Sequence, residues 1–350
     1  MTVARQGASF VKIDSFCHLL PPAYAKRFFA IDDSAAIVNL QTRTREVPAL
    51  TDMDLRFQQM DEFGDYRQII NVASPPMEDL GPAARNAEMA RLANEGMAEL
   101  VEDHPDRFAG FCAAVSLDDV DRAIEEAEYA FTHLNAVGVQ IYCHVKRGPM
   151  DDKRYDPFWE KLAGSGKMIQ VHPNRNSTWA DYPTEERSKF EIWWALGWEY
   201  DLSAFMARMV FSGVIERWPD LKFLVHHGGA MIPHFPGRIG AGWDQLGSRT
   251  PESQKGDVEG YPLTKRPFDY FKNFYVDTAC FGAGDALRTS VRFFGHDRVL
   301  FASDSPFDPE KGPGFIRATI QNVEELDLSS AQRQAIYHDN AVRLFGLTAP

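Results

Sequence analysis

Residues 222–229 read Lys-Phe-Leu-Val-His-His-Gly-Gly, an apolar run that ends abruptly in two histidines and two glycines. The run is short and β-prone, and the turn-forming Trp218-Pro219-Asp220 precedes it, so it predicts a buried parallel strand. Gly228 and Gly229 let the backbone turn closely beneath His227. Ligands gather at the carboxyl ends of parallel strands, so His227 is the first candidate site residue.

Short apolar segments of this kind recur along the chain and alternate with helical patterns. Besides 222–225, strands are expected at 10–18, 68–73, 111–115, 137–141, 168–172, 274–277 and 298–302. Eight buried strands alternating with helices predict an α/β fold, a (β/α)8 TIM barrel formed as a single domain by residues 1–350. Residues 23–50 are expected to make an irregular excursion over the mouth of the barrel. No GxGxxG motif follows the first strand, which argues against dinucleotide binding.

Composition narrows the class of protein further. The 350 residues carry 37 basic and 50 acidic side chains, a formal net charge of −13, and this balance argues against a nucleic-acid-binding surface. The apolar runs are too short to span a membrane, and the N-terminus has no signal-peptide core. The four cysteines lie far apart, without the spacing of a disulfide framework or a zinc knuckle. A cytoplasmic protein is expected.

Four polar side chains lie at or just after the ends of predicted strands. His18 ends the first strand and His172 the fifth, while His227 follows the sixth and Asp304 the eighth. In a barrel these ends meet at one mouth. Neutral imidazoles with one carboxylate suit a divalent metal such as zinc or manganese, with positions left open for water or substrate. The pattern therefore predicts a metal site.

Several motifs resemble the amidohydrolase superfamily, and within it the branch of aminocarboxymuconate-semialdehyde decarboxylase and the aromatic acid decarboxylases. The resemblance covers nearly the whole chain. The matching segments are residues 13–22, 104–108, 138–141, 172–173, 211–221, 227–233, 301–306 and 340–346.

The resemblance implies roles for individual residues. It gives His18, His172 and Asp304 as metal ligands, His227 as a second-sphere acid/base or substrate-orienting residue, and Asp304 as a second catalytic group. The opening motif of the family is His-x-His or Glu-x-His, but here Phe16 stands at the first ligand position. A benzyl group cannot coordinate a cation, so a shortened set of ligands is expected. The candidate substrate-binding residues are Phe16, Tyr142, Asn174 and Trp198.

The resemblance implies metal-dependent, non-oxidative decarboxylation of an aromatic or unsaturated carboxylic acid. Hydrolysis or hydration of a lactone or enol acid would use the same residues and stays open. A metal-free binding protein on the same barrel is a third possibility, for which Phe16 is the evidence. A homodimer is expected from the resemblance and from the cluster of Trp193, Trp194 and Trp198.

Overall fold

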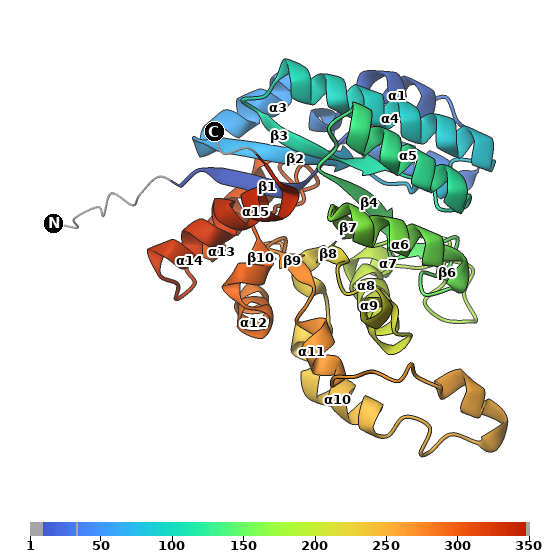
Figure 1. The fold of residues 1–350 in the computed structure, drawn as a ribbon. Helices are drawn as coiled ribbons and strands as arrows, with labels where there is room; N and C mark the ends of the chain where they lie inside the picture. The colour runs from blue at the N-terminus through green and yellow to red at the C-terminus, as the bar shows by residue number, and fades with distance from the viewer. Residues whose placement is uncertain (1–9, 33, 348–350) are drawn as a thin grey trace.

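A computed structural model describes residues 10–32 and 34–347, and it confirms the predicted barrel (Figure 1). Eight strands follow one another in the sheet, and every pair of neighbours from β1 to β10 is parallel. The strands of this sheet are β1 (Lys12–Leu19), β2 (Tyr66–Val72), β3 (Phe108–Ala114), β4 (Gly138–Tyr142), β7 (Met168–His172), β8 (Lys222–Val225), β9 (Tyr275–Asp277) and β10 (Val299–Leu300). A two-stranded hairpin, β5 (His144–Val145) with β6 (Gly148–Pro149), follows β4.

The segment that follows β10 joins the sheet back to β1. The Ser15 amide donates to the carbonyl of Phe301 at 2.8 Å, and the His18 amide donates to the carbonyl of Ser305 at 2.9 Å. The buried Asp14 carboxylate also accepts a hydrogen bond from the Ser303 amide at 3.0 Å. These contacts bring the ends of the first and last strands together, which places His18 beside Asp304.

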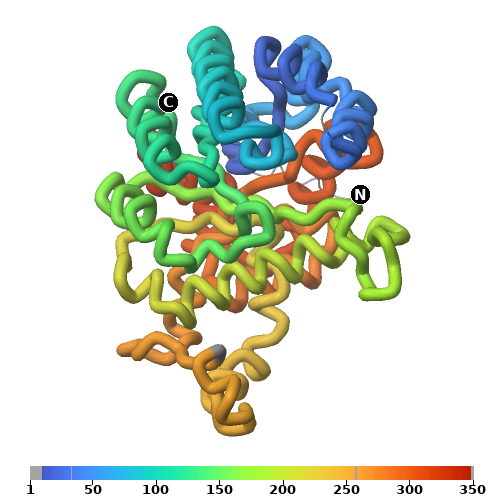
Figure 2. Tube along the Cα trace, turned by 90° about the vertical axis from the view of Figure 1, so that its right-hand side faces the viewer, coloured from blue at the N-terminus to red at the C-terminus, as the bar shows by residue number. Residues whose placement is uncertain are grey.

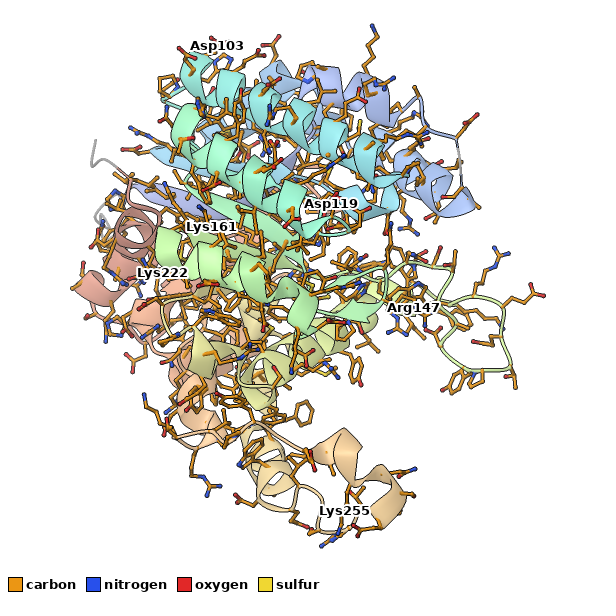
Figure 3. The ribbon with its side chains drawn as sticks, turned by 45° about the vertical axis from the view of Figure 1, so that its right-hand side comes forward. Asp103, Asp119, Arg147, Lys161, Lys222 and Lys255 are labelled. Atoms are coloured by element: carbon orange, nitrogen blue, oxygen red, sulfur yellow. The ribbon has the colours of Figure 1, made fainter. Side chains whose placement is uncertain are left out.

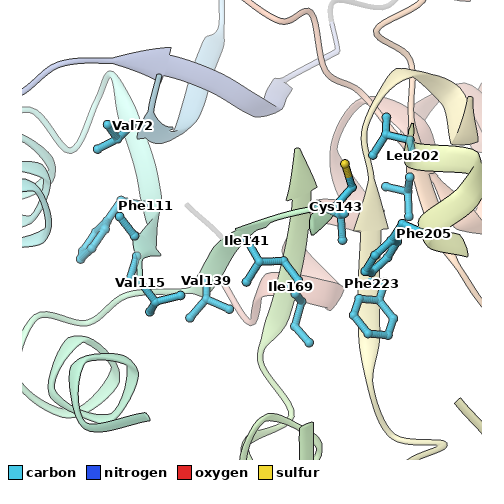
Figure 4. Close-up of a cluster of buried hydrophobic side chains, with 14 of the residues drawn as sticks. Val72, Phe111, Val115, Val139, Ile141, Cys143, Ile169, Leu202, Phe205 and Phe223 are labelled. Atoms are coloured by element: carbon cyan, nitrogen blue, oxygen red, sulfur yellow. The ribbon is translucent and has the colours of Figure 1, made fainter. Parts of the chain in front are cut away.

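Helices surround the barrel, and the main apolar core lies between them and the strands (Figure 4). Side chains such as Phe111, Ile169 and Phe223 point outward from alternate strand positions into this layer. No helix among the described residues is both long and apolar enough to cross a membrane. The helices are α1 (Pro22–Phe28), α2 (Ala35–Arg45), α3 (Met53–Met60), α4 (Ala83–Asp103), α5 (Val120–His133), α6 (Asp156–Ser165), α7 (Ile192–Ala195), α8 (Gly197–Phe211), α9 (Val214–Arg217), α10 (Pro236–Asp244), α11 (Pro267–Phe271), α12 (Gly284–Phe294), α13 (Pro313–Glu324), α14 (Ser330–Gln334) and α15 (Asn340–Phe345).

The inward-facing side chains form a second apolar cluster. It takes residues from six of the eight strands of the barrel, among them Ile13 and Phe16 of β1, Met168 of β7 and Leu224 of β8. Residues of α15, including Phe345, belong to the same cluster. Because side chains alternate along a strand, the residues two positions beyond Leu224 and four beyond Met168 face the same way, toward the mouth.

Residues 23–50 are more regular than the sequence suggested. Helices α1 and α2 occupy most of this segment, and the Ser34 side chain caps α2 by accepting from the Ile37 amide at 3.2 Å. The expectation of an irregular excursion was wrong here because α2 is mostly polar and carries only a weak apolar stripe. Few periodic apolar residues mark it in the sequence.

A long arm leaves the body of the molecule between α10 and α11 (Figures 1 and 2). It corresponds to the polar stretch at 247–265, and Lys255 lies near its tip (Figure 3). Figure 3 also shows that the two ends of the barrel lie on opposite sides of the molecule. Lys222 begins β8 on one side of the molecule, and Arg147, which lies beyond the carboxyl end of β4, is on the other.

Glu78 provides a test of this fold through the pH dependence of stability. Its side chain is buried and accepts from the Leu117 amide at 2.6 Å, and burial raises its pKa to about 7. Because the pKa is higher in the folded than in the unfolded chain, this stabilisation is complete below the unfolded pKa and is lost as the pH rises through 7. In the wild type, we expect this titration to lower the free energy of unfolding by at most roughly 3 kcal/mol between pH 5 and pH 8, since one pKa unit is worth about 1.4 kcal/mol. Glu78→Gln should abolish this decrease.

Urea unfolding at the two pH values measures the effect. The variant keeps the acceptor for Leu117, so its free energy of unfolding should fall less than that of the wild type over this range. Glu88→Gln, at an exposed position, is the control and should behave as the wild type does. An equal fall in Glu78→Gln and wild type would show that Glu78 is not the titrating group.

Candidate functional site

Four histidine and aspartate side chains meet at the carboxyl ends of the strands. His18 comes from β1, His172 from β7 and His226 from the residue after β8, and Asp304 lies in the loop after β10. The ring centres of His18 and His172 are 5.1 Å apart, and those of His172 and His226 are 5.9 Å apart. His18, His172 and Asp304, which the sequence placed together, therefore lie around one point.

Asp304 stands at the centre of this group. Its Oδ1 atom lies 3.1 Å from Nε2 of His18 and 3.2 Å from Nε2 of His226. Burial alone would raise the pKa of Asp304, but the two imidazoles outweigh burial and hold its pKa well below the usual range. Asp304 is therefore an anion at any pH at which the protein works.

The donor set fits a divalent cation. One ligand atom from each of His18, His226 and Asp304 lies within 4.8 Å of the others, and all three residues are buried. Neither nitrogen of the fully buried His18 has a well-aligned hydrogen-bond partner, a costly arrangement unless another group occupies the site. Nδ1 of His172 lies 2.6 Å from the carbonyl of Pro173, so it carries the proton and leaves Nε2 as a free donor atom.

The sequence analysis did not identify His226 or its partner Asp277 as site residues. Nδ1 of His226 lies 2.5 Å from Oδ2 of Asp277, and both side chains are fully buried. Burial works to lower the pKa of His226, but the Asp277 and Asp304 carboxylates outweigh it and raise the pKa to about 10. Strand alternation could have found His226, because Leu224 faces the interior and His226 is two residues further along.

The side chain of His227 points in a different direction from that of His226. Its backbone has a φ of 57°, and its Nδ1 atom lies 3.2 Å from the carbonyl of Ala279, which leaves Nε2 buried without a partner. Burial, with the neighbouring His226, lowers the pKa of His227 to about 4, so the ring is neutral at pH 7. The ring borders a cavity of about 220 Å³ that Glu199 and Phe281 also line.

Glycine is required two residues after His227. Gly229 has a φ of +78°, and a Cβ atom there would lie 2.7 Å from the ring of Phe294. The close turn that the two glycines predicted is therefore present, and it carries the chain away from the mouth.

Phe16 lies inside the site, fully buried. Its ring is stacked on the imidazole of His226, with centres 3.9 Å apart and planes inclined by 9°. The ring centres of His18 and His172 are 5.6 Å and 6.1 Å from that of Phe16. The benzyl group therefore forms one wall of the site.

The remaining predicted residues surround His172. The ring centre of Tyr142 is 5.1 Å from that of His172, and the ring centre of Trp198 is 5.6 Å from that of His172. Trp198 and Asn174 line a second cavity, of about 210 Å³, together with Arg175 and Trp193. The Nε atom of Arg175 beside this cavity is buried without a hydrogen-bond partner, while its Nη1 atom lies 3.4 Å from Oδ1 of Asp201.

Comparisons with known proteins agree with the fold. The amidohydrolase family model matches residues 13–347. The gamma-resorcylate decarboxylase of Polaromonas sp. is 30% identical over 305 residues, which are 84% of this chain and 87% of that protein. The 5-carboxyvanillate decarboxylase of Sphingomonas paucimobilis has a similar structure, with a TM-score of 0.80, 24% identity, and coverage of 97% of this chain and 100% of that one.

A third similar protein is a dihydroxybenzoic acid decarboxylase from Polaromonas sp., whose structure contains bound manganese and the inhibitor 2-nitroresorcinol. It has a TM-score of 0.73 and 25% identity, and the match covers 97% of this chain and 98% of that one. The family model spans nearly the whole chain, and the eight-stranded barrel is the fold that its relatives share. This chain belongs to the amidohydrolase family.

Proposed function

We propose that this protein is a metal-dependent, non-oxidative decarboxylase of an aromatic carboxylic acid. The observation that carries the proposal is the convergence of ligand atoms from His18, His226 and Asp304 within 4.8 Å, beside the ring of His172, in a chain that is 30% identical to a gamma-resorcylate decarboxylase. A divalent cation held there would fix the oxygens of the substrate and stabilise the negative charge that develops as the carboxylate leaves. Manganese is the first cation to test, and zinc suits the same donors.

The substrate would lie between the histidines and the cavity beside Trp198. An aromatic acid can stack against Phe16 or Trp198, and Arg175 and Asn174 can hydrogen-bond to its polar groups. His227 presents a neutral Nε2 atom that can accept a hydrogen bond from a substrate hydroxyl. The ring of Tyr142 packs against that of His172.

The reaction exchanges a carboxylate for a proton at one ring carbon. Because Asp304 is ionised, it would first take a proton from water, leaving hydroxide, and one of its two oxygen atoms would then pass that proton to the ring carbon that loses its carboxyl group. The bond between that carbon and the carboxyl carbon then breaks, and carbon dioxide leaves with no net oxidation. The fully buried Phe16 and the half-buried Trp198 form apolar walls that limit the access of water to this carbon.

The assembly is proposed to be a homodimer. Trp193 is buried and Trp198 lines a cavity, so these two tryptophans pack within the subunit, whereas Trp194 is exposed. The neighbouring Phe190 and Leu196 are 88% and 59% exposed, and these apolar side chains support a subunit contact instead. Light scattering should give a mass near twice 39.5 kDa at micromolar concentration, and a monomer mass would contradict the proposal.

Carbon dioxide release tests the proposed reaction. Protein loaded with manganese is mixed with carboxyl-labelled hydroxybenzoates, including 2,6-dihydroxybenzoate and 5-carboxyvanillate, and labelled carbon dioxide is followed by mass spectrometry. We expect one carbon dioxide per acid consumed. Incorporation of ¹⁸O from water into a lactone or enol acid, without carbon dioxide release, would point to a hydrolase or hydratase. Binding of the acids without turnover would favour a binding protein.

A further inference from the structure

Asp14 carries a buried carboxyl group that the proposed reaction does not use. It lies on β1, four residues before His18, and its side chain is fully buried. Its Oδ1 atom accepts from the Ser303 amide at 3.0 Å, and its Oδ2 atom accepts from the Ser303 hydroxyl at 2.5 Å. Ser303 directly precedes Asp304 in the chain. Asp14 therefore binds both donors of the residue that leads into Asp304.

The Asp14 carboxyl group belongs to a longer series of buried hydrogen bonds. Its Oδ2 atom also accepts from the Tyr66 hydroxyl at 2.6 Å, and that hydroxyl accepts from the side-chain amide of Gln68 at 3.0 Å. The Gln68 side-chain oxygen in turn accepts from Nε of Arg56 at 2.8 Å. These four side chains are at most 3% exposed, and the two polar residues link the guanidinium to the carboxyl group across the core. Together with Ser303 they form the Asp14 chain.

Arg56 connects the Asp14 chain to the other side of the site. Its Nη1 atom donates to the carbonyl of His18 at 2.8 Å. The Asp14 chain therefore begins at the backbone of His18 and ends at the residue before Asp304. We propose that it fixes His18 and Asp304 relative to each other, with Asp14 as a positioning residue of the site. The inference deepens the proposed function, on which it rests for the roles of these two side chains.

The backbone of Asp304 needs such support. It has a φ of 63°, a left-handed conformation that residues other than glycine adopt only at a cost in free energy. The Ser303 hydroxyl accepts from the Ser305 amide at 3.2 Å, and the Ser305 carbonyl accepts from the His18 amide at 2.9 Å. The residues on both sides of Asp304 are thus fixed to β1, one of them through Asp14.

A different account gives the Asp14 chain only a structural role, in which it closes the barrel. The two accounts differ in where a broken chain has its effect. A loss of stability alone would speed hydrogen exchange throughout the barrel, whereas a loss of positioning would first affect residues 301–307 and the site. Hydrogen exchange is a direct measure, because the amide of Ser303 donates to Asp14 and that of Ser305 donates to the Ser303 hydroxyl.

Three single variants break the Asp14 chain at different bonds. Tyr66→Phe removes one hydroxyl, Ser303→Ala removes the other, and Asp14→Asn places an amide nitrogen against donors at one of its two oxygen positions. The double variant Tyr66→Phe with Ser303→Ala tests whether the bonds act as one unit. Tyr155→Phe is the matched control, because its side chain is also buried and its hydroxyl accepts from Arg154 at 2.6 Å, in the segment before α6.

Two measurements are made on each full-length protein, with thermal melts to check folding. Hydrogen exchange of the metal-free protein is followed by mass spectrometry, and manganese affinity is measured by equilibrium dialysis. In Asp14→Asn we expect exchange in residues 301–307 to be at least 10-fold faster, while α6, between β4 and β7, keeps the wild-type rate.

Manganese affinity should fall about 10-fold in each single variant, the usual effect of losing a group that orients a metal site. The double variant should also lose about 10-fold rather than 100-fold, because either change breaks the same chain. Tyr155→Phe should match the wild type in both measurements.

Wild-type exchange in residues 301–307 together with wild-type manganese affinity, in folded Asp14→Asn, would overturn the inference. So would an even rise in exchange over the whole barrel, or a loss near 100-fold in the double variant. Tyr66→Phe, which removes a single oxygen atom, decides the question if Asp14→Asn fails to fold. If exchange changes locally as expected but the manganese-loaded wild type releases no carbon dioxide, the proposed function fails and the positioning role stands.

Discussion

Replacing Asp304 with asparagine is expected to lower kcat/KM about 1,000-fold and to weaken cation binding, the largest effect of any single change in this protein. A loss of this size corresponds to about 4 kcal/mol of transition-state stabilisation. Asp304 is the one carboxylate among the four side chains that meet at the strand ends, and its Oδ1 atom lies within 3.2 Å of both His18 and His226. The amide removes the negative charge and puts a poorer ligand in its place.

Turnover and metal content should fall together in Asp304→Asn. Steady-state kinetics on the best acid from the carbon dioxide assay, with metal analysis of the same sample, measures both. Asp285→Asn, at a fully exposed position on α12, should leave both unchanged. If Asp304→Asn retained near-normal turnover while folded, the centre of catalysis would lie elsewhere in the molecule.

Replacing His227 with asparagine is expected to lower kcat about 100-fold while the cation is retained. His227 offers a neutral, unpartnered Nε2 atom at the edge of the site, and its Nδ1 atom is held by the carbonyl of Ala279. Asparagine cannot reproduce both the position and the basicity of that nitrogen. The contrast with His226 is sharp, because the two imidazoles are stacked 3.9 Å apart but serve different purposes in this account.

Steady-state kinetics measures kcat, and metal analysis of the same sample measures the retained cation. His133→Asn on the exposed face of α5 is the control and should change neither quantity. Wild-type kcat in folded His227→Asn would remove His227 from catalysis. Loss of the cation in folded His227→Asn would instead make His227 a ligand of that cation.

The sequence predicted the barrel well because buried parallel strands carry a strong local signal. Runs such as Lys222–Val225 are apolar and bounded by turns, and each occupies the predicted place in the sheet. The helices of 23–50 were not predicted, because a polar surface helix such as α2 shows little periodicity. Local patterns could not reveal that Ser34 would cap it.

The site was only partly predictable for a different reason. His18, His172 and Asp304 lie at or just after the ends of predicted strands, and Asp277 ends the predicted strand at 274–277, but its sequence surroundings do not show which side chain it contacts. The pair of Asp277 and His226 forms across neighbouring strands, 51 positions apart in the chain, and depends on the register of β8 against β9. No local sequence pattern encodes that register. Strict alternation along β8 would have indicated His226, and the left-handed turn at His227 explains why both histidines are buried near the site.

Metal content tests the central claim most directly. The full chain is purified without chelator or a nickel column, dialysed, and analysed by plasma mass spectrometry beside an assay of carbon dioxide release. The account predicts about one divalent cation per chain, with turnover that is lost when a chelator removes the cation and restored when manganese is returned. Undiminished carbon dioxide release from protein that contains no divalent cation would contradict it.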